Sequence, residues 1–172
     1  MKKSGVYLGS IILGLNDALV EITGTLAGLT FALQNSKIIL VGGFIAGLAA
    51  SLSMAGSEYL STKAECNHTK KEKKMKNHKN PKTAAFYTWL SYFLTLLFLL
   101  APYLILNNAY HALIWTLANG ILIIAIFSYN YSIEKNENFY RKFMEMAVIS
   151  LGVSAISFGV GYFMRIFLRI NV

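Results

Sequence analysis

The sequence predicts an all-α membrane protein with five transmembrane helices, and three observations lead to this prediction. Hydrophobic residues make up 55% of the 172 residues and charged residues only 14%, whereas soluble domains average about 25% charged residues. The apolar residues form five long blocks, and a block of about 20 apolar residues crosses a bilayer as a helix. Lipid permits only helices or closed barrels, and these blocks are too long and too uniformly apolar to be barrel strands.

The five blocks form a single predicted transmembrane domain that covers residues 1–172. The predicted helices span residues 8–33, 38–60, 84–106, 110–132 and 143–168. The chain starts with two lysines after Met1, as a signal peptide can, but the first apolar stretch is far longer than the 7–15 residues of such a peptide. We therefore expect the first helix to be retained. The short turn QNSK joins the first two helices, so they are antiparallel neighbours.

The net charge of +8 is concentrated in one connection between two apolar blocks. Residues 62–83 contain eight lysines and two glutamates, a local charge of +6. Basic runs are typical of nucleic-acid binding, but a run that connects two membrane spans is better explained as a loop at the cytoplasmic membrane surface. The sequence thus predicts a basic cytoplasmic loop over 61–83, a cytoplasmic N-terminus, an outside C-terminus, and no nucleic-acid partner.

Two carboxylates lie inside the first apolar block. Asp17 and Glu21 occur in the stretch LGLNDALVEITGTLAGL. Their four-residue spacing places both side chains on one face of a helix, about 6 Å apart. An acidic residue at the centre of a membrane helix costs about 2.5–3.5 kcal/mol on insertion scales, and such residues by default mark functional sites.

The second block carries Met54 and Glu58 at the same spacing, in the stretch SLSMAGSEYLSTKAE. Oxygen ligands suit Mn and Fe(II), and a thioether disfavours Mg and Ca. Because the two helices are antiparallel neighbours, we expect Asp17, Glu21, Met54 and Glu58 to converge on one cation, with the Asn16 amide nearby. The alternative is that these acids are protonated packing residues, or that Glu58 only reaches the lipid headgroups.

Two further acids are secondary candidates for a metal site. Glu65 lies in the basic connection, where Cys66, His68 and His78 would form a weak metal-collecting segment, although the surrounding lysines repel a dication. Glu145 lies between two methionines at the start of the fifth block and either assists metal uptake or caps that helix. The sequence contains no phosphate loop, zinc motif or nucleophile elbow, so we do not expect an enzyme.

The stretch GLNDALVEITGTLAGL, followed by GGFIAGLAASLSMAGSEYLSTKAE, resembles the first two helices of the vacuolar iron transporter family. The resemblance covers about residues 13–65 most specifically, and the five-helix layout is also similar. It implies a dimeric antiporter that exchanges protons for Fe(II) or Mn(II) and exports the metal from the cytosol. It also implies that Asp17, Met54 and Glu58 lie on the metal pathway.

Two features depart from that family. Glu21 stands where the family more often has a small hydroxyl residue. The connection after the second helix is short and basic, whereas many members carry a Glu-rich metal-binding domain there. The resemblance therefore supports a short prokaryotic-type member with a membrane pathway and without the storage domain.

The resulting hypothesis is a homodimeric, multi-pass transporter in a prokaryotic plasma (inner) membrane. It needs no cofactor, its substrate is Fe(II) or Mn(II), its coupling ion is the proton, and its other partner is the lipid bilayer. Protons and metal would compete for the same carboxylate oxygens while the site alternates between the two sides. The alternatives are a non-transporting membrane scaffold and a small proton-coupled transporter of organic cations.

Overall fold

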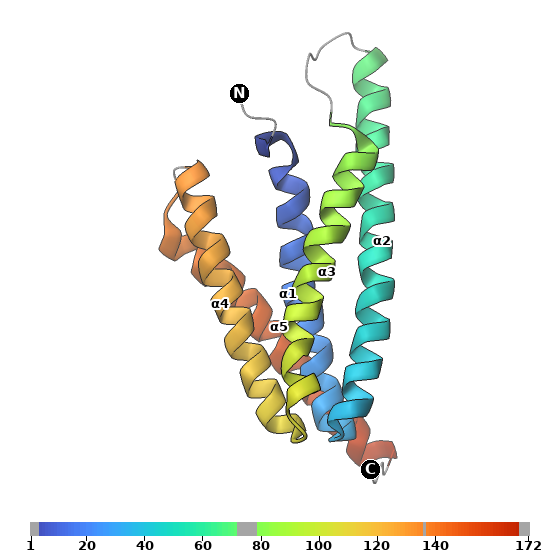
Figure 1. Ribbon diagram of the computed structural model, residues 1–172, viewed down its shortest axis with the longest axis vertical. Coiled ribbons are helices and arrows are strands. Elements are labelled where there is room, and N and C mark those ends of the chain that lie inside the picture. Colours follow the sequence, from blue (N-terminus) through green and yellow to red (C-terminus); the bar gives the residue numbers. More distant parts are fainter. Residues whose placement is uncertain (1–3, 72–78, 136, 169–172) are drawn as a thin grey trace. The chain divides into compact units, whose positions relative to one another are not determined.

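The computed structural model describes residues 4–71, 79–135 and 137–168, which form five long helices (Figure 1). These helices are α1 (Ser4–Leu33), α2 (Ser36–Lys71), α3 (Pro81–Ile105), α4 (Ala109–Lys135) and α5 (Phe139–Leu168). Each of the five contains a stretch that is long and apolar enough to cross a membrane. The prediction of an all-helical chain with five candidate membrane spans is therefore confirmed.

An asparagine precedes each of the helices α2 to α5 and caps its first turn. The side-chain oxygen of each one accepts a hydrogen bond from a backbone N–H two residues later, at 2.9–3.1 Å. These caps are Asn35, Asn80, Asn108 and Asn138. The first N–H groups of a helix have no partner within it, and asparagine is among the residues that satisfy them best. The polar residues between the apolar blocks thus determine where these four helices begin.

The end of α2 differs most from the prediction. The sequence predicts a helix end at residue 60 and a loop over 61–83, but α2 continues to Lys71. Hydropathy marks where a helix leaves the membrane, and residues 61–71 contain no Gly or Pro that would end the helix there. The predicted loop is therefore wrong over 61–71. Residues 72–78, with Lys73, Lys74, Lys76 and His78, lie outside the described residues.

Other helix ends also lie beyond the apolar blocks: α1 begins at Ser4 instead of residue 8, and α2 at Ser36 instead of 38. Helix α3 begins at Pro81 instead of residue 84, α4 ends at Lys135 instead of 132, and α5 begins at Phe139 instead of 143. Proline is favoured at the first position of a helix, where its missing N–H costs nothing. The cap asparagines at 80 and 138 set the other boundaries further out than hydropathy alone indicates.

The residue contacts divide the chain into two compact units, and each unit takes parts of several helices. The first unit comprises the described residues of Met1–Ala18 and Ala46–Thr95, and the second those of Leu19–Ile45 and Leu96–Val172. The first thus holds the start of α1, the later part of α2 and the start of α3. The prediction of a single transmembrane domain stays a prediction.

Helices α1 and α3 approach each other closely in the first unit. Thr88 Oγ1 donates a hydrogen bond to the Ser10 carbonyl at 3.0 Å. Gly14 lies directly against the Thr88 carbonyl, where a Cβ atom would overlap it. A residue without a side chain lets the two backbones meet, as is common between membrane helices.

Buried hydroxyl groups join the helices of the second unit. The Thr23 and Ser150 hydroxyls lie 3.2 Å apart, and the hydroxyls of Thr30 and Tyr103 lie 2.6 Å apart. All four side chains are buried. Hydrogen bonds of this kind satisfy polar groups that lipid would leave without partners, and they hold membrane helices together.

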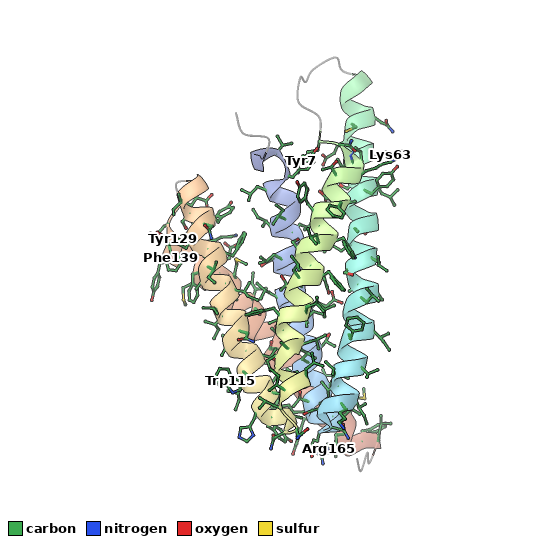
Figure 2. All side chains as sticks on the ribbon, in the orientation of Figure 1. Tyr7, Lys63, Trp115, Tyr129, Phe139 and Arg165 are labelled. Atoms are coloured by element: carbon green, nitrogen blue, oxygen red, sulfur yellow. The ribbon has the colours of Figure 1, made fainter. Side chains whose placement is uncertain are left out.

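Aromatic side chains mark both ends of the helices of the second unit. Figure 2 shows Tyr129 and Phe139 toward one end of that unit, and Trp115 and Arg165 toward the other. Trp115 and Tyr129 are each 61% exposed. Aromatic rings with a polar edge concentrate at the two membrane–water interfaces, and the exposure of Trp115 and Tyr129 agrees with such positions.

Candidate metal-binding site on helices α1 and α2

The two carboxylates of α1 lie within its candidate membrane span, Val6–Leu33. Asp17 is half-buried, whereas Glu21 is exposed at the surface of the chain. Because the helix is continuous from Ser4 to Leu33, the predicted placement of both side chains on one helix face follows from their four-residue spacing. The span of α1 therefore carries two acids on one helix face, and the side chain of one of them, Glu21, is exposed.

Met54 and Glu58 lie one turn apart on α2, and both are half-buried. The Ser10 hydroxyl of α1 donates a hydrogen bond of 2.6 Å to the Glu58 carboxylate. This contact confirms that α1 and α2 are neighbours. It also defines the register of the two helices within the first unit, because Ser10 and Glu58 must lie at the same height along the helix axes.

That register separates Glu58 from Asp17 along the helices. Ser10 precedes Asp17 by seven residues, which is about 10 Å along the axis. Met54 lies about one turn closer than Glu58 to the level of Asp17 in the antiparallel pair. In the part of the chain that the structure describes, no three His, Cys, Asp or Glu side chains form a group that could hold one ion. The predicted convergence of the carboxylates on one cation stays a prediction.

The extension of α2 gives Glu65 a defined position. Glu65 is exposed and lies on the same helix as Glu58, seven residues further on. Seven residues are about two helical turns, so both carboxylates lie on the face of α2 that also carries Met54. Glu65 and Glu58 thus lie on one face of α2, between its C-terminal end and Met54. Of the other predicted members of a metal-collecting segment, Cys66 donates a hydrogen bond to the Lys79 carbonyl, and the side chain of His68 lies outside the described part of the chain.

Asn16 and Glu145 have less favourable positions for holding a metal. Asn16 is half-buried on α1 next to Asp17. Glu145 is exposed on α5 and forms an ion pair with Lys142 at 3.1 Å. Since α5 begins at Phe139, Glu145 lies in its second turn, and the expected cap role is wrong because Asn138 caps this helix.

Ser10 is a residue at the candidate site that sequence reasoning missed. Its side chain is 1% exposed. Its hydroxyl reaches Glu58, which is 48 residues away in the sequence, because α1 and α2 pack side by side. The available signal was spacing: Ser10, Gly14, Asp17 and Glu21 recur at intervals of four, three and four residues, which is one face of a helix. The first two positions of this stripe pack against α2 and α3.

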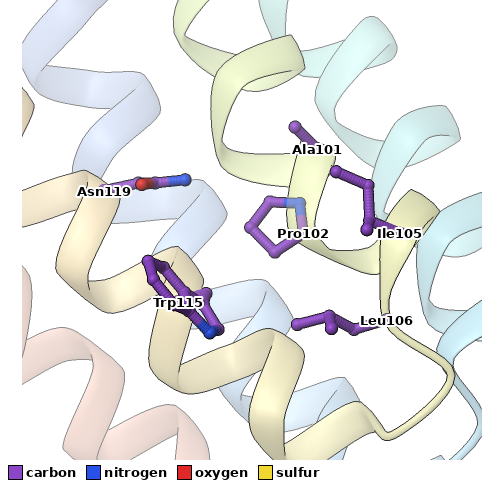
Figure 3. A pocket seen from close by; sticks show the side chains of 6 residues that line it. All are labelled: Ala101, Pro102, Ile105, Leu106, Trp115 and Asn119. Carbon is purple, nitrogen blue, oxygen red and sulfur yellow. The ribbon is translucent and has the colours of Figure 1, made fainter.

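A separate cavity of about 330 Å³ lies between α3 and α4 in the second unit (Figure 3). Pro102, Ile105 and Leu106 face Trp115 and Asn119 across it. The described lining contains no carboxylate, imidazole or thiol group, so it does not suit a divalent metal. Its apolar walls instead fit the hydrocarbon of a lipid chain.

The fold and these side chains define a class: an all-helical, multi-pass membrane protein with acidic residues inside its first two spans. Comparison with protein families identifies it further. The chain matches the model of the VIT family over residues 8–79 and 68–162. It therefore belongs to the VIT family, the vacuolar iron transporters, which are membrane metal-ion transporters. No curated protein matches the chain.

Proposed function

We propose that this protein is a proton-coupled transporter that exports Fe(II) or Mn(II) from the cytosol. The observation that carries this proposal is the pair of carboxylates on one face of α1 inside an apolar span, in a chain of the VIT family. An acidic residue in a membrane span is costly and is retained where ions or protons pass.

The donor atoms set the class of metal. Asp17, Glu21 and Glu58 offer carboxylate oxygens, and Met54 offers a thioether sulfur. Hard oxygen donors alone suit Mg and Ca, whereas a thioether adds preference for softer transition metals. The combination favours Fe(II) and also accommodates Mn(II).

Proton coupling follows from competition for the same oxygens. A carboxylate inside a membrane span is stable when it carries a proton or when a cation neutralises it. Binding of a dication to Asp17 and its neighbours therefore releases protons, and release of the metal allows protons to return. Alternating access of the site to the two sides of the membrane then links the two fluxes.

The line of acids on α2 suggests the route of uptake. Glu65 and Glu58 lead from the end of α2 toward Met54 on one helix face. The excess of lysines near this end assigns it to the cytoplasm by the positive-inside rule. Metal would thus enter from the cytosol, as export from a prokaryotic cell across its inner membrane requires.

A homodimer would complete the site. One chain contributes carboxylates that do not form a group of three among its described residues. A second copy related by a two-fold axis next to α1 doubles the number of ligands at the axis, as an isologous interface does. Glu21, which is exposed on α1, would then face the partner copy instead of lipid.

The direct test is metal flux into proteoliposomes that contain the purified protein and a metal-sensitive dye. With an imposed pH gradient, Fe(II) or Mn(II) should enter faster than in protein-free liposomes, and the rate should fall when the gradient is collapsed. Mg(II) at the same concentration should produce no signal. Metal flux that ignores the pH gradient would contradict proton coupling while leaving metal transport intact.

A melting experiment in detergent separates this proposal from the two alternatives. A transporter of metals should melt at a higher temperature with Fe(II) or Mn(II), because a ligand that binds only the folded state stabilises it. A transporter of organic cations should respond to quaternary ammonium ions, and a scaffold to neither. Stabilisation by organic cations alone would overturn the metal assignment.

A further inference from the structure

A second site lies at the connection of α2 and α3, away from the acids of α1. It is a cavity of about 580 Å³ in the first unit. The described residues that line it are Tyr59, Lys63, Cys66, Asn67, Lys79, Asn80, Pro81 and Lys82. They include three lysines and no acidic residue, so the cavity is strongly positive.

Contacts within the protein hold the walls of this cavity together. The Cys66 thiol donates a hydrogen bond to the Lys79 carbonyl at 3.4 Å, which joins α2 to the segment before α3. The backbone N–H of Asn80 donates to the Tyr7 hydroxyl at 3.2 Å, which joins the same segment to α1. These hydrogen bonds therefore connect the lysine-bearing segments to α1, α2 and α3.

The positions of two lysines are also constrained. The Lys63 ammonium group lies 5.5 Å from the centre of the Tyr59 ring, a cation–π contact that keeps its side chain at the wall. Lys82 belongs to the first turn of α3, whose cap Asn80 accepts its backbone N–H at 3.0 Å. The start of a helix carries partial positive charge, which adds to that of the lysines.

The cavity lies where the chain leaves the apolar region. The candidate span of α2 ends at Asn67 and that of α3 begins at Pro81. Tyr7 and Lys63 lie at this end of the first unit (Figure 2), and the Tyr7 ring contacts the Tyr87 ring at 5.4 Å between centres. Tyrosines with lysines beside them are typical of the headgroup layer of a membrane.

We propose that this cavity binds the phosphate of an anionic phospholipid headgroup. Three ammonium groups attract an anionic phosphate and repel a divalent metal, so the site is separate from metal transport. A lipid is favoured over a free anion because the cavity lies at the border of two membrane spans, where headgroups are present at high local concentration. The cavity thereby anchors the α2–α3 connection to one leaflet.

The first test compares two triple variants that lose the same charge. Lys63, Lys79 and Lys82, which line the cavity, are replaced by glutamine in one, and Lys37, Arg141 and Lys142, which do not, in the other. Binding of a short-chain phosphatidylglycerol to the full chain in detergent is measured by native mass spectrometry, with phosphatidylcholine as the neutral lipid. Removing one lysine near an anionic surface weakens attraction about fivefold, so the cavity variant should bind on the order of a hundredfold more weakly.

The control triple should lose much less affinity for phosphatidylglycerol. Equal losses in both triples would show diffuse attraction to the positive charge of the protein and overturn the proposal, as would unchanged binding in the cavity variant. Melting curves verify that each triple is folded. If the cavity triple is not, Lys82→Gln alone is compared with Lys142→Gln, and a loss of phosphatidylglycerol affinity of about fivefold is expected for Lys82→Gln only.

The second test uses Cys66, the single cysteine of the chain, as a reporter of occupancy. Phosphatidylglycerol should slow the reaction of the thiol with a maleimide severalfold in the wild type and not in the cavity triple. Phosphatidylcholine should have no effect. Equal protection by inorganic phosphate would overturn the assignment to a lipid, and absence of protection by phosphatidylglycerol would overturn the site itself.

Discussion

In the proposed mechanism, Asp17 is the residue whose chemistry matters most for transport. Replacing it with asparagine keeps the size and the hydrogen bonding of the side chain and removes its charge. The folded protein should be as stable as the wild type or more stable, because the cost of placing an acid in the span is about 2.5–3.5 kcal/mol and falls for an amide. Metal flux should fall to the level of protein-free liposomes, because an amide is a weak ligand and exchanges no proton.

The matched controls for Asp17→Asn are Glu21→Gln and Glu137→Gln. Glu21→Gln should reduce flux less and shift the apparent affinity or the preference between Fe(II) and Mn(II). Glu137→Gln, in the turn before α5, removes the same charge outside the candidate site and should leave flux unchanged. Normal transport by folded Asp17→Asn would place the metal pathway elsewhere, and loss of folding would make the carboxylate structural.

Ser10 should act as a positioning residue for Glu58. Ser10→Ala removes the 2.6 Å hydrogen bond to the carboxylate, and a hydrogen bond to a charged group contributes about 1.5–3 kcal/mol. We expect a higher half-saturating metal concentration, about fivefold or more, with a smaller change in maximal flux. Ser10→Thr, which keeps the hydroxyl, should restore the affinity.

Ser91→Ala serves as the control for Ser10→Ala. The Ser91 hydroxyl donates to a carbonyl of its own helix, that of Thr88, at 3.1 Å. Its removal should therefore leave metal affinity unchanged. A similar loss of affinity in both variants would show that the effect is general destabilisation of the helix contacts.

Individual side chains could be predicted from the sequence where their chemistry conflicts with their surroundings. Asp17 and Glu21 are conspicuous because acids are rare in apolar blocks. Ser10 is not conspicuous, because serine is common in membrane helices and its partner is distant in the chain. Which carboxylates meet depends on the register of two helices, and register is a property of packing that periodicity does not specify.

At the level of helices, the close contact between α1 and α5 yields a sharp comparison of two glycines. Gly161 lies against the backbone of Gly28, where a Cβ atom would overlap the carbonyl group. Gly152 lies on the same helix, and a Cβ atom there meets nothing within 4 Å. Gly161→Ala should lower the free energy of unfolding by about 1–3 kcal/mol, as overpacking does, and Gly152→Ala should be neutral or stabilising.

Thermal unfolding of both variants in the same detergent tests this comparison. The melting temperature should drop for Gly161→Ala alone. Equal melting temperatures would mean that α5 shifts away from α1 at no cost, which would contradict a packed contact there.

Helix existence was predictable from the sequence, whereas helix ends were not. Five apolar blocks identify the five spans, because lipid forces each block into a helix. The ends depend on capping by Asn35, Asn80, Asn108 and Asn138 and on the absence of helix-breaking residues in 61–71. These signals are polar and lie outside the blocks, so hydropathy does not detect them.

At the level of the whole molecule, the distribution of basic residues predicts the orientation. Lys2, Lys3 and the lysines of 62–83 should lie in the cytoplasm, and the C-terminus after Arg169 outside. An odd number of spans places the two termini on opposite sides. Accessibility labelling of tags at each end of the protein in intact cells checks this, and labelling of both termini on one side would contradict the five-span topology.

The exposed carboxylate of α1 predicts where two copies meet. Glu21 lies inside the span Val6–Leu33 and is exposed on a single chain, and contact of an acid with lipid hydrocarbon is costly. A partner copy on this face removes that contact and brings a second set of acids to the axis.

In a background with Cys66→Ser, Glu21→Cys should therefore form cross-linked dimers in the membrane. Ile156→Cys, at a position of α5 that is 70% exposed, should not. Cross-linking through Ile156→Cys alone would place the interface on α5, and Glu21 would then need a water-filled cavity instead of a second copy.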